Sequence, residues 1–181
     1  LLDAPWCTSV AESLRRSDSL APILSGSVAV QCTYFDKSPS VNWLVPIHQD
    51  LSIPVRDQIA HPDLLGWATK EGSLFVQPPP AVLEQLVAVR LHLDDSSGEN
   101  GPLRVVPGSH RLGRVPASEQ AARREGAGEV VCIAPRGGVV AMKPLLLHAS
   151  SKSNSPRPRR VLHFLYGPRE LPFGLAWLRA V

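Results

Sequence analysis

Short apolar segments separated by turn residues dominate this chain. Eighteen Pro and thirteen Gly, spread along the sequence, favour many turns over long helices. Segments rich in Val, Ile, Leu or aromatic residues and bounded by turn residues predict strands. These strands are Ser27–Phe35, Trp43–Ile47, Leu86–Leu93, Leu103–Val106, Glu129–Ala134, Gly138–Met142, Leu145–Ala149 and Arg160–Tyr166. The pattern therefore predicts a mostly β fold, a sandwich or a jelly roll closed around a cavity.

Two segments predict helices, and a third predicts no regular structure. The first twenty residues favour a helix, with Thr8 or Ser9 as its N-cap. A short helix is expected at Pro79–Gln85, where prolines occupy the first turn. The residues from Leu51 to Pro80, which include Trp67, form either a lid or entrance to a site or a packed surface excursion.

Composition indicates an ordinary globular chain. With 181 residues, of which 44% are hydrophobic and 19% charged, a single domain spanning residues 1–181 can bury its own core. The chain does not begin with Met, which leaves open that further residues precede it. No apolar run approaches the roughly 18 residues of a membrane span, and the first residues do not resemble a signal peptide. We therefore expect a cytoplasmic protein without membrane contact, while the oligomeric state is not predicted.

Charge and cysteine content exclude two further classes of protein. The net charge is +3, but the basic residues form neither a nucleic-acid motif nor a stripe interleaved with aromatic residues, so no nucleic-acid partner is expected. Cys7, Cys32 and Cys132 are odd in number and widely spaced, which favours free thiols over disulfides or a zinc site.

A His-x-Asp pair on a strand places an imidazole and a carboxylate on one face, where a single metal ion can take both. Three such pairs occur. The pair His61 and Asp63 lies in a polar stretch beside a proline, where a surface His and a helix cap are the simpler interpretation. The pair His92 and Asp94 shares a strand face with Arg90, either lining a cavity or ending the strand at the surface.

The pair His48 and Asp50 lies at the end of an apolar strand, where a jelly roll opens. His148 ends the apolar run Pro144–Leu147 and is the best candidate for a third ligand from a distant strand. Two His and one carboxylate make the facial triad of non-haem Fe(II) oxygenases. Arg159 follows His148 by eleven residues, and a neighbouring strand could bring its guanidinium into the same cavity to bind a dicarboxylate.

These residues resemble the phytanoyl-CoA dioxygenase family of Fe(II)/2-oxoglutarate oxygenases. The resemblance lies in the segments HQD at 48–50, NGPLRVVPGSHRLG at 100–113, LLLHAS at 145–150 and NSPRPRRVLHFLY at 154–166. It implies a double-stranded β-helix, which is a cupin-like jelly roll, with a few flanking helices. It also implies a hydroxylase that uses Fe(II), 2-oxoglutarate and O2 on a small-molecule substrate and releases succinate and CO2.

The resemblance also implies roles for individual residues. His48, Asp50 and His148 correspond to the iron ligands. The offset of eleven residues from His148 favours Arg159, rather than Arg157 or Arg160, for the distal carboxylate of 2-oxoglutarate, and Ser150 matches a position that also touches this co-substrate. Gln31 resembles a cavity-lining glutamine of the ectoine hydroxylase branch.

Arg90 departs from the family, where relatives often hold Ser or Trp at this position. It is expected to bind the near carboxylate of 2-oxoglutarate or an anionic substrate, unless a side chain such as Asp94 pairs with it. Two alternatives to the hydroxylase stay open. One is a non-catalytic jelly-roll protein that binds a metal or ligand, and the other is a cupin-type metalloenzyme that does not use 2-oxoglutarate. The substrate itself is not predicted.

Overall fold

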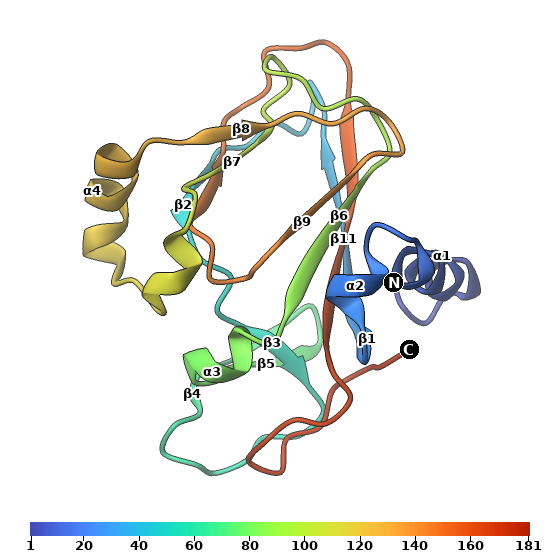
Figure 1. Ribbon diagram of the computed structural model, residues 1–181, viewed down its shortest axis with the longest axis vertical. Helices are drawn as coiled ribbons and strands as arrows, with labels where there is room; N and C mark the ends of the chain where they lie inside the picture. The colour runs from blue at the N-terminus through green and yellow to red at the C-terminus, as the bar shows by residue number, and fades with distance from the viewer. The chain divides into compact units, whose positions relative to one another are not determined.

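The computed structural model describes residues 1–181 (Figure 1). The chain divides into two compact units. Unit 1 contains Leu1–Thr33, Leu51–Ala88 and Phe164–Val181, and unit 2 contains Tyr34–Asp50 and Val89–His163. Three sheets have the orders β1-β11-β6-β9, β2-β10-β7-β8 and β3-β5-β4. None of the helices is long and apolar enough to cross a membrane. The prediction of a mostly β chain is confirmed, while that of a single domain stays a prediction.

Three strands, β1 (Ser27–Lys37), β6 (Val87–His92) and β11 (Arg159–Pro168), have residues in both units. Within unit 2, β6 continues into a loop whose Leu93 N–H donates to Arg160 O. On its other side, the His92 N–H donates to Gly138 O, next to β9 (Val139–Met142). The ends of these strands therefore place residues 90, 92 and 159 on neighbouring strands.

The second sheet lies entirely in unit 2. Its strands are β2 (Val45–His48), β10 (His148–Ser150), β7 (Leu103–Val105) and β8 (Val130–Cys132), and all neighbours are antiparallel. His148 lies opposite His48, but Ser150 lies opposite Val45, so β2 carries one extra residue against β10. Such a bulge tolerates Pro46, which has no N–H for the ladder, on this edge strand. The helix α4 (Ala117–Ala127) and the 3-10 helix η1 (Ser109–Leu112) also belong to unit 2, and α4 contacts β2 (Figure 1).

Unit 1 contains the helices α1 (Pro5–Arg16), α2 (Ala21–Leu24) and α3 (Pro80–Leu83) and a small sheet formed by β3 (Ile53–Val55), β4 (Leu65–Lys70) and β5 (Ser73–Gln77). The first helix is confirmed, but the predicted N-cap is wrong. Proline is favoured in the first helical turn, and the helix therefore begins at Pro5 after Ala4. The Tyr166 hydroxyl donates to Ala11 O at 2.8 Å and anchors this helix to β11.

Two expectations about regular structure are corrected. The segment from Leu51 to Pro80 is not irregular, because it folds into the sheet of β3, β4 and β5. Helix α4 was not predicted, since its only buried residue is Gln120 and it shows no apolar stripe. Each of the eight predicted strands is present, with ends that differ by up to three residues. All three cysteines are free, as expected.

Candidate functional site

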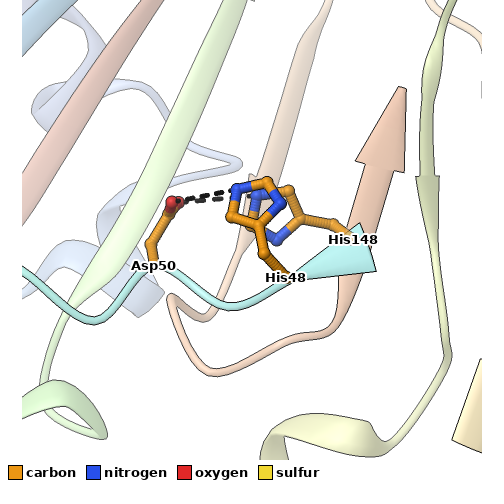
Figure 2. A group of neighbouring side chains, drawn as sticks. All are labelled: His48, Asp50 and His148. Atoms are coloured by element: carbon orange, nitrogen blue, oxygen red, sulfur yellow. Dashed lines mark ion pairs between the residues drawn. The ribbon is translucent and has the colours of Figure 1, made fainter. Parts of the chain in front are cut away.

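Three side chains in unit 2 meet at the junction of β2 and β10 (Figure 2). His48 ends β2, Asp50 follows it by two residues, and His148 begins the neighbouring β10. The two imidazole rings lie with their centroids 4.2 Å apart. One ligand atom from each of the three residues lies within 4.8 Å of the others, so a single metal ion could take all three. The structure therefore brings together the trio that the sequence predicted.

Backbone carbonyls orient both imidazoles toward Asp50. His48 Nδ1 lies 2.8 Å from Pro46 O, and His148 Nδ1 lies 2.8 Å from Leu146 O. A carbonyl only accepts hydrogen bonds, so each Nδ1 carries the proton and each Nε2 keeps its lone pair. These Nε2 atoms lie 3.6 and 3.7 Å from the two carboxylate oxygens of Asp50. Metal-binding histidines have this arrangement, with the far nitrogen bonded to a carbonyl, so the residues fit a divalent metal ion.

The charges of the trio also suit a metal. Loss of water around Asp50 would raise its pKa, but contact with His48 and the nearby His148 hold the pKa below its usual range. Burial lowers the pKa of His148, which favours the neutral ring. Contact with the Asp50 carboxylate raises the pKa of His48. Because a metal needs deprotonated ligands, the shifts of Asp50 and His148 favour binding of the ion, whereas the shift of His48 opposes it.

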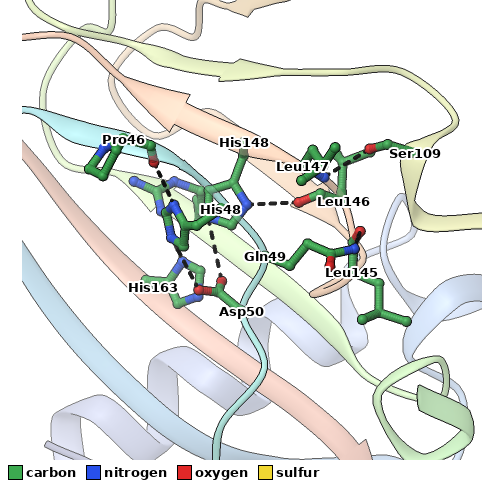
Figure 3. A network of polar contacts seen from close by, with 11 residues as sticks. Pro46, His48, Gln49, Asp50, Ser109, Leu145, Leu146, Leu147, His148 and His163 are labelled. Atoms are coloured by element: carbon green, nitrogen blue, oxygen red, sulfur yellow. Dashed lines mark hydrogen bonds and ion pairs between the residues drawn. The ribbon is translucent and has the colours of Figure 1, made fainter. Parts of the chain in front are cut away.

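Gln49, between two of the three residues, ties this loop to the rest of unit 2 (Figure 3). Its side-chain amide donates to Gly113 O at 2.8 Å and to Leu145 O at 2.6 Å. Its Oε1 accepts from the Val115 N–H at 2.8 Å, and the Asp50 N–H donates to Pro144 O. The chain before and after Gln49 is thus held against the segment that leads into His148.

Ser109 holds Leu147, the residue that precedes His148 (Figure 3). Its hydroxyl donates to Val106 O and accepts from the Leu147 N–H, both at 2.8 Å. Val106 and Leu147 pack with Val115 in a buried cluster that Ile47 also contacts. The residues that immediately precede His48 and His148 therefore share one apolar support.

A cationic group lies next to β10. Arg159, the first residue of β11, is 3% exposed, and its Nε donates to Asn100 O at 3.1 Å. Lys37, the last residue of β1, is 1% exposed, and its Nζ donates to Ser150 Oγ at 2.8 Å and to Ser151 O at 2.6 Å. Burial and then the charge of Arg159 lower the pKa of Lys37 to about 8. No carboxylate is paired with either cation, so the group suits a bound anion.

The buried Arg90 and the half-buried His163 form a second pair. Arg90 Nη1 lies 3.0 Å from His163 Nδ1, and burial followed by the charge of Arg90 lowers the pKa of His163 to about 3. His163 is therefore neutral and accepts from the guanidinium through Nδ1. Of the two alternatives for Asp94, the structure supports the strand end. Asp94 lies beyond the end of β6 and binds Arg160 in a bidentate pair, so it does not pair with Arg90.

The sequence did not predict Lys37 or His163 as site residues. The predicted first strand ends at Phe35, two residues before Lys37. In the structure the strand reaches Lys37, so residues 33, 35 and 37 share one face. Arg159 and His163 are four residues apart on β11 and therefore share a face of this strand. This spacing would have indicated His163 as a neighbour of the site.

Two predicted positions lie in unit 1. Gln31 is part of β1, and its side-chain amide donates to Thr33 Oγ1 at 3.1 Å, so its place near the site stays a prediction. His61 and Asp63 lie outside the strands, with His61 Nδ1 3.8 Å from Asp63 Oδ2 and its ring against Phe173. This agrees with the simpler interpretation of a surface histidine.

The chain is similar to proteins of known family and structure. A family model of phytanoyl-CoA dioxygenase (PhyH) matches residues 7–161. Among solved structures, the non-heme alpha ketoglutarate dependent epimerase SnoN from nogalamycin biosynthesis has a TM-score of 0.67 and 15% identity, over 98% of this chain and 63% of its own. EctD from S. alaskensis with 2-oxoglutarate and 5-hydroxyectoine has a TM-score of 0.66 and 18% identity, over 96% of this chain and 58% of its own. AviO1 from Streptomyces viridochromogenes has a TM-score of 0.59 and 21% identity, over 94% of this chain and 61% of its own. No curated protein matches the chain.

The chain thus spans between 58% and 63% of the length of these three structures. At such low identity they show a shared fold, and the predicted jelly roll is confirmed. Family and fold together support an oxygenase of the Fe/2-oxoglutarate type. Because the family model covers most of its residues, this chain belongs to the phytanoyl-CoA dioxygenase (PhyH) family.

Proposed function

We propose that this protein is an Fe(II)- and 2-oxoglutarate-dependent hydroxylase of a small molecule. The observation that carries the proposal is that one unit combines a metal-binding trio with a buried, unpaired cationic group. His48, Asp50 and His148 would hold the iron, and Arg159, Lys37 and Ser150 would hold the far carboxylate of 2-oxoglutarate. When bound, Fe(II) and 2-oxoglutarate would supply the oxidising chemistry, in which 2-oxoglutarate, O2 and R–H give succinate, CO2 and R–OH.

The protein's own contribution is to position these groups. The backbone carbonyls of Pro46 and Leu146 accept hydrogen bonds from the Nδ1–H groups of His48 and His148. Both Nε2 atoms therefore face Asp50. The Ser150 hydroxyl donates to Gly101 O at 2.8 Å and accepts from Lys37, so it holds the Lys37 ammonium beside the site. Two buried cations close to this hydroxyl favour a dianion over a neutral co-substrate.

Anaerobic binding tests the proposal directly. The protein with Fe(II) and 2-oxoglutarate should develop the visible absorption of an iron-bound keto acid, and air should then release succinate slowly without any added substrate. Arg159→Met should weaken 2-oxoglutarate binding about tenfold or more, since it removes a charged hydrogen-bond donor. Arg160→Met is the matched control, because its neighbouring guanidinium pairs with Asp94 outside the site.

Three results would count against this function. Wild-type protein that takes up no iron would support the non-catalytic alternative. Iron-dependent activity that is indifferent to both 2-oxoglutarate and Arg159→Met would support a cupin-type enzyme. Equal losses of 2-oxoglutarate binding in Arg159→Met and Arg160→Met would show that the assignment of Arg159 is wrong.

A further inference from the structure

Arg90 is a buried cation without a counter-charge. It lies on β6, is 8% exposed, and has one polar contact, from Nη1 to His163. Its Nε is buried without a hydrogen-bond partner, and no Asp or Glu of unit 2 forms an ion pair with it. The ring of Phe35 lies under the guanidinium, with its centroid 5.4 Å from Cζ. Burying a charged group in this way is costly unless an anion accompanies it.

The neighbours of Arg90 face the same interior and add no negative charge. His92, two residues further along β6, is 1% exposed, and neither of its ring nitrogens has a partner. Burial and the charge of Arg90 lower the pKa of His92 to about 4, so its ring is neutral. Arg159 Nη1 is also buried without a partner. This set of residues offers donors and positive charge to a ligand, and it holds no carboxylate of its own.

Arg90 also lies within electrostatic reach of the metal-binding trio. The carboxylate of Asp50 raises the pKa of Arg90, although burial and Arg159 lower it overall to about 10. Arg90 in turn contributes to the lowered pKa of His148. The guanidinium is therefore charged at neutral pH, and an anion beside it would also lie near the trio.

The charges of the site indicate that this anion is bound in addition to 2-oxoglutarate. Lys37, Arg90 and Arg159 carry three positive charges, whereas Asp50 carries the negative charge of the trio. The two charges of Fe(II) and those of 2-oxoglutarate cancel, so loading the site leaves the positive excess unchanged. Lys37 and Ser150 are in contact, and Arg159 binds the adjacent turn, whereas Arg90 is bonded to His163 instead.

We infer that Arg90, held in place by His163, binds an anionic group of the substrate, so that the substrate is a carboxylate or a phosphate. The inference rests on the proposed function, because it assigns the 2-oxoglutarate carboxylates to other groups. His92 supplies a neutral donor beside the same anion.

Small anions test this inference without knowledge of the substrate. Protein loaded anaerobically with Fe(II) and 2-oxoglutarate is titrated with acetate and, separately, with inorganic phosphate in a calorimeter. We expect wild type to bind one equivalent of one of them, and Arg90→Met to weaken that binding about tenfold or more, as expected for a lost charged hydrogen bond. Arg90→Lys should recover part of the affinity, and a preference for acetate or phosphate identifies the anion.

Controls separate the possible failures. Affinity for 2-oxoglutarate, followed by visible absorption, should change less than about threefold in Arg90→Met, and retained absorption shows that the variant is folded. Arg160→Met should bind both probes as wild type does. Loss of 2-oxoglutarate binding in Arg90→Met would assign Arg90 to the co-substrate and overturn the inference. Absence of probe binding to loaded wild type, or equal binding by Arg90→Met, would also overturn it. Failure of wild type to load at all concerns the proposed function instead.

Discussion

Replacing Gln49 should disturb the candidate metal site, although its side chain contacts none of the three residues His48, Asp50 and His148. Gln49→Met keeps the length and apolar body of the side chain but removes three hydrogen bonds. The carbonyls of Gly113 and Leu145 and the N–H of Val115 would then lie unpaired in a region where Gln49 itself is 5% exposed. The change therefore costs both stability and the placement of the residues on either side.

The magnitude follows from the number of bonds. A buried hydrogen bond contributes about 1 kcal/mol net, and leaving its partner unsatisfied costs about 1–3 kcal/mol. Three bonds that share one side chain and partly relax together should cost about 3 kcal/mol in the free energy of unfolding. Loss of support for ligand residues typically weakens metal binding about 10- to 100-fold, and we expect Gln49→Met to fall in that range.

Urea unfolding of the metal-free protein measures the first effect, and competition with a metal chelator measures the second. Gln85→Met is the matched control, since this exposed glutamine donates only to Ala81 O, one helical turn away. We expect the control to lose less than about 0.5 kcal/mol, as surface substitutions do. If both variants lose the same stability and bind metal equally well, Gln49 does not organise the site.

Three further substitutions give independent checks. Lys37→Met should raise the 2-oxoglutarate concentration needed for half-saturation while leaving iron affinity unchanged, with the exposed Lys70→Met as control; an unchanged requirement would remove Lys37 from the co-substrate site. His92 has a pKa of about 4 in the folded protein and about 6.5 when unfolded, so the unfolded chain binds more protons between these values and stability is lost as pH falls through that window. His92→Leu should therefore lose less unfolding free energy than wild type between pH 7 and pH 5 in urea titrations, and an identical loss would contradict the assignment. Tyr166→Phe removes the bond to Ala11 O and should cost about 1 kcal/mol in the same assay, whereas an unchanged midpoint would show that the hydroxyl does not anchor α1.

The positions of eight strands along the chain could be predicted because each predicted strand is a short apolar segment bounded by Gly, Pro or polar residues. The sheet of β3, β4 and β5 could not, since β3 has only three residues and β4 is almost entirely exposed. Helix α4 lacks an apolar face, so hydrophobic periodicity has nothing to detect there, although its Ala, Glu and Arg content favours a helix.

Some residues of the candidate site could likewise be predicted from the sequence, and others could not. The His-x-Asp pair at residue 48 could be recognised because it follows an apolar segment, and His148 because it follows the apolar run Pro144–Leu147. The partner of Arg90 could not, since the contact with His163 joins residues 73 positions apart on two strands. Asp94 was the nearest carboxylate in sequence, but the end of β6 leaves it on the surface with Arg160.

Strand β10 is only three residues long, yet it carries a metal-site histidine at one end and the Ser150 hydroxyl at the other. Residues two apart on a strand point to the same side and lie about 7 Å from each other. Under the proposed function, this spacing would set the distance between the iron and the far carboxylate of the co-substrate. A keto diacid one carbon shorter than 2-oxoglutarate would fall short of Ser150 and Lys37, and one carbon longer would have to buckle. In that complex, two peptide units of β10 would therefore select the length of the co-substrate.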